Sequence, residues 1–316
     1  MRCVLAVDLG GTKCSAAVID REGKILSQRT APVDLSSPSG PVLQILQLAK
    51  DLAGKKKPAA AFAAAAVAVP GLVRPNGTVW APNLRGWERM PLARRLKRLL
   101  KIPVLVESDR NAAVLGECWR GAARAKSDVI VLMIGTGIGA GILSGGQIIR
   151  GAHELSGCAG WLTVTRDSVS SPSGAGELES LVSGPALARI ARQRLRDREE
   201  SSLARLNVSK ITAHDVAAAA RHGDALAIDI FNNAGRLLGF AVADIVSLFD
   251  PEIVVLGGGM ALAADLYFAS LRSAMLERAQ PLAAKKVKIV VSKLSDSVNL
   301  LGCGHLAWTS IGVRAS

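Results

Sequence analysis

Residues 3–20, CVLAVDLGGTKCSAAVID, contain the pattern that decides the fold: an apolar strand, a glycine turn and a returning apolar strand. The same arrangement returns at residues 128–143, DVIVLMIGTGIGAGIL. Each copy predicts a buried β-hairpin, because glycine allows a tight turn between two apolar runs. A repeated unit of this kind indicates a duplicated architecture, in which each copy opens its own half of the chain.

Strands and helices alternate after each hairpin. Residues 59–69 favour a helix by propensity alone, but we predict a buried strand in their second half because Val67 and Val69 lead into Pro70-Gly71. The other predicted strands are 25 onward, 104–107, 253–256 and 286–291, and the predicted helices are 40–53, 109–119, most of 185–233 and about 299 to the end. This order predicts an α/β protein with two mixed sheets and flanking helices.

Composition narrows the class of protein. A chain of 316 residues can form two domains, and 3% aromatic residues suit packed α/β layers better than a carbohydrate-stacking β-sandwich. The five cysteines are scattered and form no CxxC pair, which supports neither a disulfide framework nor a zinc knuckle. We expect a cytoplasmic protein, because the chain opens on a strand without a signal pattern and has no uninterrupted apolar run long enough for a membrane.

The formal net charge of +13 admits two interpretations. A basic protein binds nucleic acid, or it attracts anionic small substrates such as nucleotide phosphates. Part of the charge lies in residues 92–101, where basic residues alternate with leucines at helical spacing. That pattern is typical of the solvated face of an amphipathic helix, and no aromatic residues interleave with it to stack bases. This pattern therefore argues against nucleic acid as a partner.

Three glycine clusters follow apolar strands. They are Gly10-Gly11-Thr12-Lys13, Gly135-Thr136-Gly137 and Gly257-Gly258-Gly259. Glycine lets backbone N–H groups approach phosphate oxygens, and a threonine hydroxyl adds a donor. One such cluster is usually an ordinary turn, but three in one chain indicate phosphate binding. None fits the P-loop pattern or the dinucleotide-binding GxGxxG pattern.

Two aspartates stand where predicted strands end. Asp8 precedes the first glycine cluster, where a carboxylate beside phosphates would hold Mg²⁺ directly or through water; the alternative is a turn-forming aspartate. Asp109 opens a predicted helix after Ser108. Residues at this position serve as helix N-caps, or Asp109 is a base that deprotonates a hydroxyl group at the lip of a cleft.

Taken together, these motifs resemble the ROK family (repressors, open reading frames and kinases), which includes bacterial glucokinases, fructokinases and N-acetylmannosamine kinases. The resemblance extends through DLGGTK at 8–13, VPG at 69–71, APNL at 81–84, ESDRNAAVLGE at 107–117, IGTGIGAGIL at 134–143, GAHELSGCAGWLTV at 151–164, LESLVSG at 178–184, VVLGGGM at 254–260 and LGCGHLA at 301–307. It implies a two-domain actin-like ATPase (ribonuclease H-like) fold with ATP and a sugar in the cleft between the domains.

The resemblance also implies site residues and bounds. By this resemblance, Asp109 is the base that deprotonates the sugar hydroxyl, usually at C6. The implied cofactors are ATP and Mg²⁺, and Asp8 would bind the Mg²⁺ directly or through water. The predicted substrate-binding residues are Gly71, Asn83, Ser108, Asp109, Cys158, Trp161 and Glu179. We place a small domain at 1–117, joined by the C-terminal helix at about 299–316, and a large domain at 118–298. Family members are often dimers or tetramers, so a homodimer is one expected assembly.

Several positions depart from the family pattern. The family has Asn-Asp where this chain has Ser108-Asp109, and Glu-x-Gly-His where this chain has Cys158-Ala159-Gly160-Trp161. The family's zinc cluster, CxCGxxGC, corresponds to residues 170–177, which contain no cysteine. Because all the zinc ligands are missing together, we expect no structural zinc.

Three functions are compatible with these motifs. The first is an ATP-dependent sugar kinase with altered acceptor specificity, since Asp8, the glycine loops and Asp109 are all retained. The second is a nucleotide-binding, catalytically weak or inactive sugar-binding or sensory protein. The third is a repressor, which we set aside because DLGGTK at residue 8 leaves no room for a preceding helix-turn-helix domain.

Overall fold

The computed structural model describes residues 3–165 and 174–312. The chain divides into two compact units. Unit 1 contains residues 1–126, 148–156 and 293–316, and unit 2 contains residues 127–147 and 157–292. The sequence places the domain boundaries at 117/118 and 298/299, whereas the chain passes between these units at 126/127 and 292/293 and returns briefly to unit 1 at 148–156.

Unit 1 is built on a five-stranded mixed sheet in the order β3-β2-β1-β4-β7. The strands are β1 (Cys3–Leu9), β2 (Lys13–Ile19), β3 (Ile25–Pro32), β4 (Phe62–Val69) and β7 (Val104–Ser108). β1, β2 and β3 form an antiparallel meander, and β4 and β7 extend the sheet in parallel with β1. A short ribbon of β5 (Leu72–Val73) and β6 (Val79–Trp80) follows β4.

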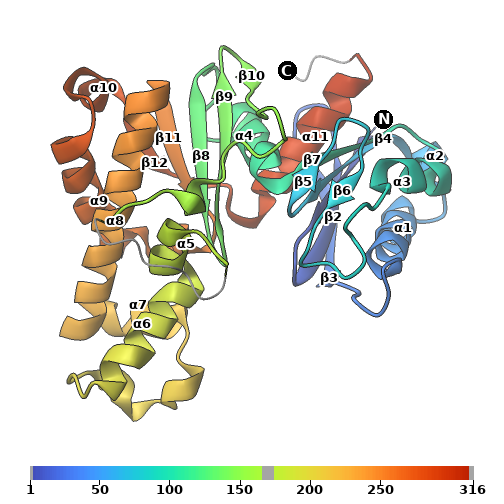
Figure 1. Ribbon diagram of the computed structural model, residues 1–316. Helices are drawn as coiled ribbons and strands as arrows, with labels where there is room; N and C mark the ends of the chain where they lie inside the picture. Colours follow the sequence, from blue (N-terminus) through green and yellow to red (C-terminus); the bar gives the residue numbers. More distant parts are fainter. Residues whose placement is uncertain (1–2, 166–173, 313–316) are drawn as a thin grey trace. The chain divides into compact units, whose positions relative to one another are not determined.

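Helices cover both faces of this sheet (Figure 1). Leu5, Val7 and Leu9 of β1 pack in one core with α1 (Gly40–Ala53) and α3 (Leu92–Leu100). Val4 and Ala6 point to the opposite face, into a second core with α4 (Asp109–Arg120) and α11 (Val298–Ser310). This division follows from the period of two in a strand, and it places Asp8, the next residue in the Val4–Ala6 row, on the α4 and α11 side.

Small residues allow α4 and α11 to pack tightly over that second face. A Cβ on Gly302 would come within 1.8 Å of the carbonyl oxygen of Ala112, and one on Gly116 within 2.2 Å of the carbonyl oxygen of Val298. Ala64, Ala66 and Ala68 line the strand beneath. The alanine-rich segment is therefore a buried strand because two helices approach it closely, as predicted, while its first residues form the short helix α2 (Pro58–Ala61).

Unit 2 repeats the sheet of unit 1 in the order β10-β9-β8-β11-β12. The strands are β8 (Val129–Ile134), β9 (Ile138–Ser144), β10 (Gln147–Ile148), β11 (Ile253–Gly257) and β12 (Lys288–Val291). β8 and β9 form the second glycine hairpin, and β11 and β12 lie parallel to β8. The predicted duplication of mixed sheets is thus confirmed.

Helices supply the rest of unit 2. They are α5 (Glu177–Val182), α6 (Gly184–Arg196), α7 (Ala213–Arg221), α8 (Ala225–Phe249), α9 (Ala264–Arg278) and α10 (Pro281–Lys286), with short 3₁₀ turns between them. α8 is long and apolar enough to cross a membrane, but 61% of its most apolar window is buried in the unit. It is therefore the core helix of unit 2, where it packs against α9. The strand predicted from Lys286 begins at Lys288, because Lys286 ends α10.

Candidate functional site

Asp8 and Asp109 lie at one edge of the unit 1 sheet. Asp8 pairs in register with Ala68 of β4, and Ala68 pairs with Glu107 of β7, so these residues form one row across parallel strands. Asp109 follows Glu107 by two positions and opens α4. The carboxyl ends of parallel strands are the usual ligand-binding edge of such sheets, and the structure brings both predicted acids there.

The N-terminus of α4 holds Asp109 in place. The Ser108 hydroxyl caps the helix by accepting a hydrogen bond from the Asn111 N–H at 3.4 Å, and Asp109 Oδ1 accepts one from the Arg110 N–H at 2.8 Å. Ser108 is buried, and its hydroxyl serves the helix cap. Ser108 therefore acts as the helix N-cap, and Asp109 is the first residue of the helix.

Burial changes the proton affinity of both carboxylates. Burial raises the pKa of Asp8 to about 6, with a further increase from the negative charge of Asp109 and a partial offset from the hydrogen bond of Asn299. Burial also raises the pKa of Asp109 above its usual value, opposed by the N–H and the positive charge of Arg110. A carboxylate with a raised pKa is a stronger base at neutral pH.

The first glycine loop joins β1 to β2 beside Asp8. The Gly10 N–H donates to the Lys13 carbonyl at 2.9 Å, which closes the turn and leaves Gly11 and Thr12 exposed at its tip. A Cβ added to Gly11 would meet no atom within 4 Å, so the backbone there is open to a ligand. Lys13 forms an ion pair with Asp296 at 2.6 Å.

Several polar residues of unit 1 that the sequence did not single out hold this edge together. Asn299 Nδ2 donates to Asp8 Oδ1 at 3.2 Å. The buried Glu107 accepts hydrogen bonds from Asn111 Nδ2 at 2.9 Å and from Arg150 Nη2 at 2.5 Å. Arg150 lies in residues 148–156, and a second contact of that segment joins the Glu154 carbonyl to Arg110. Apart from Glu107 and Asn111, which are four positions apart, these partners are far apart in sequence, and no local motif marks them.

The second and third glycine loops meet in unit 2. The Gly135 N–H donates to the Gly137 carbonyl at 2.9 Å, which closes the turn of the β8–β9 hairpin and exposes Thr136. Gly258 has φ +80°, and a Cβ there would lie 2.4 Å from the carbonyl oxygen of Ile134. The loop after β11 therefore packs directly against the end of β8, and a Cβ on Gly135 would lie 3.8 Å from the Gly259 nitrogen.

Glu179 lies beneath the second loop. Its Oε2 accepts a hydrogen bond from the Ile138 N–H at 2.7 Å and would lie 2.8 Å from a Cβ on Gly137. The structure thus shows one oxygen of this predicted sugar ligand bound to the backbone of the glycine hairpin. A carboxylate accepts several hydrogen bonds, so this contact leaves Glu179 able to accept hydrogen bonds from a ligand as well.

The remaining predicted substrate residues lie on loops in each unit. In unit 1, Gly71 follows the end of β4 with φ +96°, and Asn83 is exposed in the turn after β6. In unit 2, Cys158 is half-buried, and Trp161 in the 3₁₀ turn Ala159–Trp161 is 66% exposed. An indole so exposed offers an apolar face to a ligand or partner.

The stretch that corresponds to the family's zinc cluster is only partly described. Residues 170–173 lie outside the described part of the chain. Glu177, at the end of the stretch, accepts hydrogen bonds from the N–H groups of Val164 and Thr165, both at 2.8 Å. The carboxylate of Glu177 therefore anchors the segment that follows Trp161.

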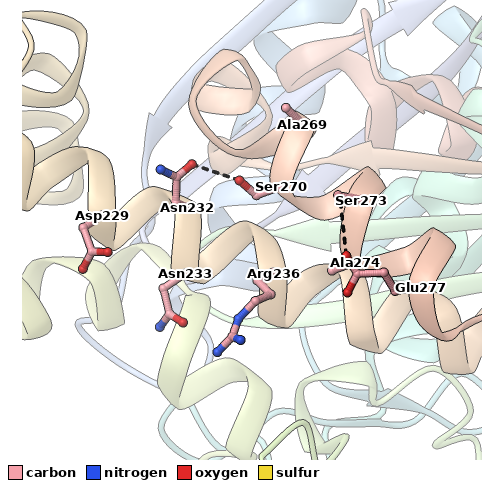
Figure 2. A pocket seen from close by; sticks show the side chains of 9 residues that line it. All are labelled: Asp229, Asn232, Asn233, Arg236, Ala269, Ser270, Ser273, Ala274 and Glu277. Atoms are coloured by element: carbon pink, nitrogen blue, oxygen red, sulfur yellow. Dashed lines mark hydrogen bonds between the residues drawn. The ribbon is translucent and has the colours of Figure 1, made fainter.

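A polar groove of about 620 Å³ runs between α8 and α9 (Figure 2). Two pairs of its polar side chains form hydrogen bonds: Ser270 with Asn232 at 2.9 Å, and Ser273 with Glu277 at 3.4 Å. Asp229 forms an ion pair with Arg194 at 2.5 Å. Because five of its polar side chains already bond within the protein, we place no functional site in this groove.

Comparison with known proteins identifies the relatives of the chain. Residues 4–310 match the ROK family. The glucokinase of Halalkalibacterium halodurans is 30% identical over 314 residues, which cover 96% of this chain and 94% of that protein. A putative xylose repressor of a Caldicellulosiruptor species is also 30% identical, over 95% of this chain and 76% of the repressor.

Solved structures agree with the sequence relatives. A ROK family glucokinase from Streptomyces griseus, in complex with glucose and AMPPNP, matches with a TM-score of 0.82 and 30% identity, over 97% of this chain and 99% of that one. The relatives thus include both sugar kinases and a putative repressor, and each matches this chain over nearly its whole length. The chain belongs to the ROK family and has the two-sheet, actin-like fold of its sugar kinases.

Proposed function

We propose that this protein is an ATP-dependent sugar kinase that transfers the γ-phosphate of ATP to a hydroxyl of a hexose or hexose derivative. The observation that carries the proposal is the pair of carboxylates, Asp8 and Asp109, held at one edge of the unit 1 sheet beside a glycine loop. Kinship with sugar kinases supports the same reaction.

In this proposal Asp109 is the general base. Its carboxylate accepts the proton of the sugar hydroxyl while the hydroxyl oxygen forms a bond to the γ-phosphorus. The bond between that phosphorus and the β–γ bridging oxygen breaks, and ADP leaves with the electron pair. The raised pKa of Asp109 favours proton uptake, and the adjacent Arg110 charge opposes that rise.

The glycine loops have the properties that ATP phosphates require. Their glycines present backbone at positions without a side chain: Gly10 and Gly11 in unit 1, and Gly135, Gly137 and Gly257 to Gly259 in unit 2. The hydroxyls of Thr12 and Thr136 are exposed at the tips of their hairpins. Both features support nucleotide binding through N–H and hydroxyl donors.

The residues around Asp8 also fit Mg²⁺. Asp8 offers a carboxylate at the phosphate loop, and the neighbouring Asn299 Oδ1 is buried without a hydrogen-bond partner among the described residues. Oxygen donors of these two kinds suit Mg²⁺, which retains several water ligands in kinase sites. When bound, Mg²⁺ supplies charge neutralisation on the transferred phosphoryl group.

The acceptor is the part of the proposal that differs from the family pattern. Gly71, Asn83 and Ser108 in unit 1 and Cys158, Trp161 and Glu179 in unit 2 remain the proposed substrate residues. Trp161 and Cys158 stand where the family has histidine and glutamate, so polar contacts to the sugar ring are replaced by an apolar surface. We therefore propose an acceptor with a less polar ring substituent than glucose at that contact.

The test is purified protein with ATP, Mg²⁺ and a panel of hexoses and N-acetylhexosamines. We expect at least one sugar to stimulate ADP release. Asp109→Asn should lower kcat about a hundredfold to ten-thousandfold while ATP binding is retained, because only proton transfer is removed. Asp51→Asn, on the exposed face of α1, is the matched control. Undiminished turnover in Asp109→Asn would remove Asp109 from the role of base.

A second candidate is a nucleotide-binding sugar sensor with little or no turnover. Two observations favour it: the replaced residues Cys158 and Trp161, and the kinship with a putative xylose repressor. The same panel separates the candidates. A sugar that binds, as measured by calorimetry, without any release of ADP while ATP still binds would support the sensor and contradict the kinase.

A further inference from the structure

The first turn of α11 contacts the first glycine loop and Asp8 from a position far away in the sequence. Asn299 Nδ2 donates to Asp8 Oδ1 at 3.2 Å across 291 positions. Asp296, just before the helix, pairs with Lys13 at 2.6 Å. The Lys13–Asp296 pair is exposed on both sides, so it contributes little by itself. The contact of Asn299 with Asp8, in contrast, is partly buried and involves a proposed metal-binding residue.

The packing of α11 fixes where Asn299 lies. Asn299 and Cys303 are four residues apart and therefore share one face of the helix. The buried Cys303 Sγ donates to the Val7 carbonyl at 3.4 Å, so this face runs along the end of β1. Gly302 allows close contact of α11 with α4 on the neighbouring side. The amide of Asn299 is thus held beside Asp8 by the core of unit 1.

The amide oxygen of Asn299, unlike its nitrogen, lacks a hydrogen-bond partner among the described residues. Its Oδ1 is buried and has no hydrogen-bond partner in the part of the chain that the structure describes. The amide cannot be reversed, because that would place Oδ1 against a carboxylate oxygen of Asp8. A buried amide oxygen without a partner is unfavourable, so this atom points to a donor supplied by a ligand.

We propose that Asn299 is a positioning residue for the metal end of the nucleotide site. Its Nδ2 fixes the orientation of the Asp8 carboxylate, and its Oδ1 accepts a hydrogen bond from a water in the hydration shell of nucleotide-bound Mg²⁺. This inference rests on the proposed kinase function. Groups that orient metal ligands in this way typically change metal affinity about tenfold to a hundredfold when removed.

The test is the substitution Asn299→Leu, which keeps the number and branching of side-chain heavy atoms and removes both polar amide atoms. Calorimetry measures binding of ATP with and without Mg²⁺, so that the readout is independent of turnover. We expect the affinity for MgATP to fall about tenfold or more, while metal-free ATP binds within about twofold of the wild type. In assays, the Mg²⁺ concentration at half-maximal rate should rise while the KM for the sugar stays unchanged.

Controls separate positioning from folding. Thr309→Val makes a matched polar-to-apolar change at the exposed end of the same helix and should change none of these values. If Asn299→Leu fails to fold, Asn299→Ser, which is smaller and polar, carries the same expectation. Unchanged Mg²⁺ dependence in a folded variant overturns the role of Asn299 alone. A wild-type protein whose ATP binding ignores Mg²⁺ overturns both this role and the proposed function.

Discussion

At the scale of single residues, the chemistry of the proposed site depends on carboxylates that the fold partly removes from water. Asp8 lies at the end of a buried row and beside Asp109, and its pKa is raised to about 6. Selection for folding stability alone would favour a neutral side chain at this position. A charge kept in such surroundings is typical of functional sites, where stability is exchanged for activity.

This position yields a prediction about stability and pH. The folded-state pKa of Asp8 is higher than its usual value, so ionised Asp8 destabilises the folded protein at neutral pH, and this penalty fades as pH falls through about 6. Asp8→Asn should therefore raise the free energy of unfolding near pH 7.5 by at most about 3 kcal/mol, with a smaller gain near pH 4.5. Turnover should be lost at both pH values.

Denaturant unfolding measures this effect in unit 1. Tryptophan fluorescence is a suitable signal, because all the tryptophans except Trp161 belong to that unit. Asp51→Asn on α1 is again the control. An Asp8→Asn protein that is less stable than the wild type near neutral pH would contradict the expectation that burial of the charge is unfavourable.

At the scale of elements, the two sheets depend on glycine where a loop must pass close to a neighbouring strand. Gly258 has φ +80° and ψ −178°, a region that only glycine adopts readily. Its missing side chain also lets the loop after β11 contact the end of β8, the strand that leads into Gly135. Gly258 is therefore needed both for the backbone conformation of its own loop and for the close approach of that loop to the end of β8.

Gly258→Ala should destabilise unit 2 and weaken ATP binding, because the new Cβ would lie 2.4 Å from a backbone oxygen. Gly223→Ala is a matched control: its φ is +86°, but a Cβ there meets no atom within 4 Å. The control should lose about 1 kcal/mol from backbone strain alone. Thermal unfolding and ATP titration of both variants measure the difference, and equal losses would show that the close approach is unimportant.

At the scale of the whole molecule, the net charge of +13 requires an explanation in terms of where the basic residues lie. The structure bears out the amphipathic helix predicted at 92–101: α3 buries Leu92, Leu96 and Leu100. Arg94, Lys97 and Arg98 are exposed, whereas Arg95 donates to the Ser39 hydroxyl at 2.9 Å. This arrangement describes a solvated helix face, and basic charge of this kind attracts anionic substrates over a distance.

We therefore expect only weak, salt-sensitive binding to nucleic acid. Fluorescence anisotropy with a labelled DNA duplex should give a Kd of about 10⁻⁴ M or weaker at physiological salt, as for non-specific contacts. Replacement of Arg94, Lys97 and Arg98 together by glutamine should leave the KM for ATP and the sugar unchanged. Sequence-dependent DNA binding tighter than about 10⁻⁶ M would instead favour a role in regulation.

Sequence by itself determined the duplicated hairpins, the three glycine loops and the membership of the ROK family, because each depends on residues that are adjacent or regularly spaced along the chain. It also identified Asp8 and Asp109 as candidate residues, since strand ends followed by glycine or a helix cap are local patterns. Only the tertiary structure decided what surrounds them. The contact of Asn299 with Asp8, the pairing of Arg150 with Glu107 and the hydrogen bond of Glu179 to the second loop join distant segments. Such contacts follow from the packing of helices on sheets, which leaves no periodic or local trace in the sequence.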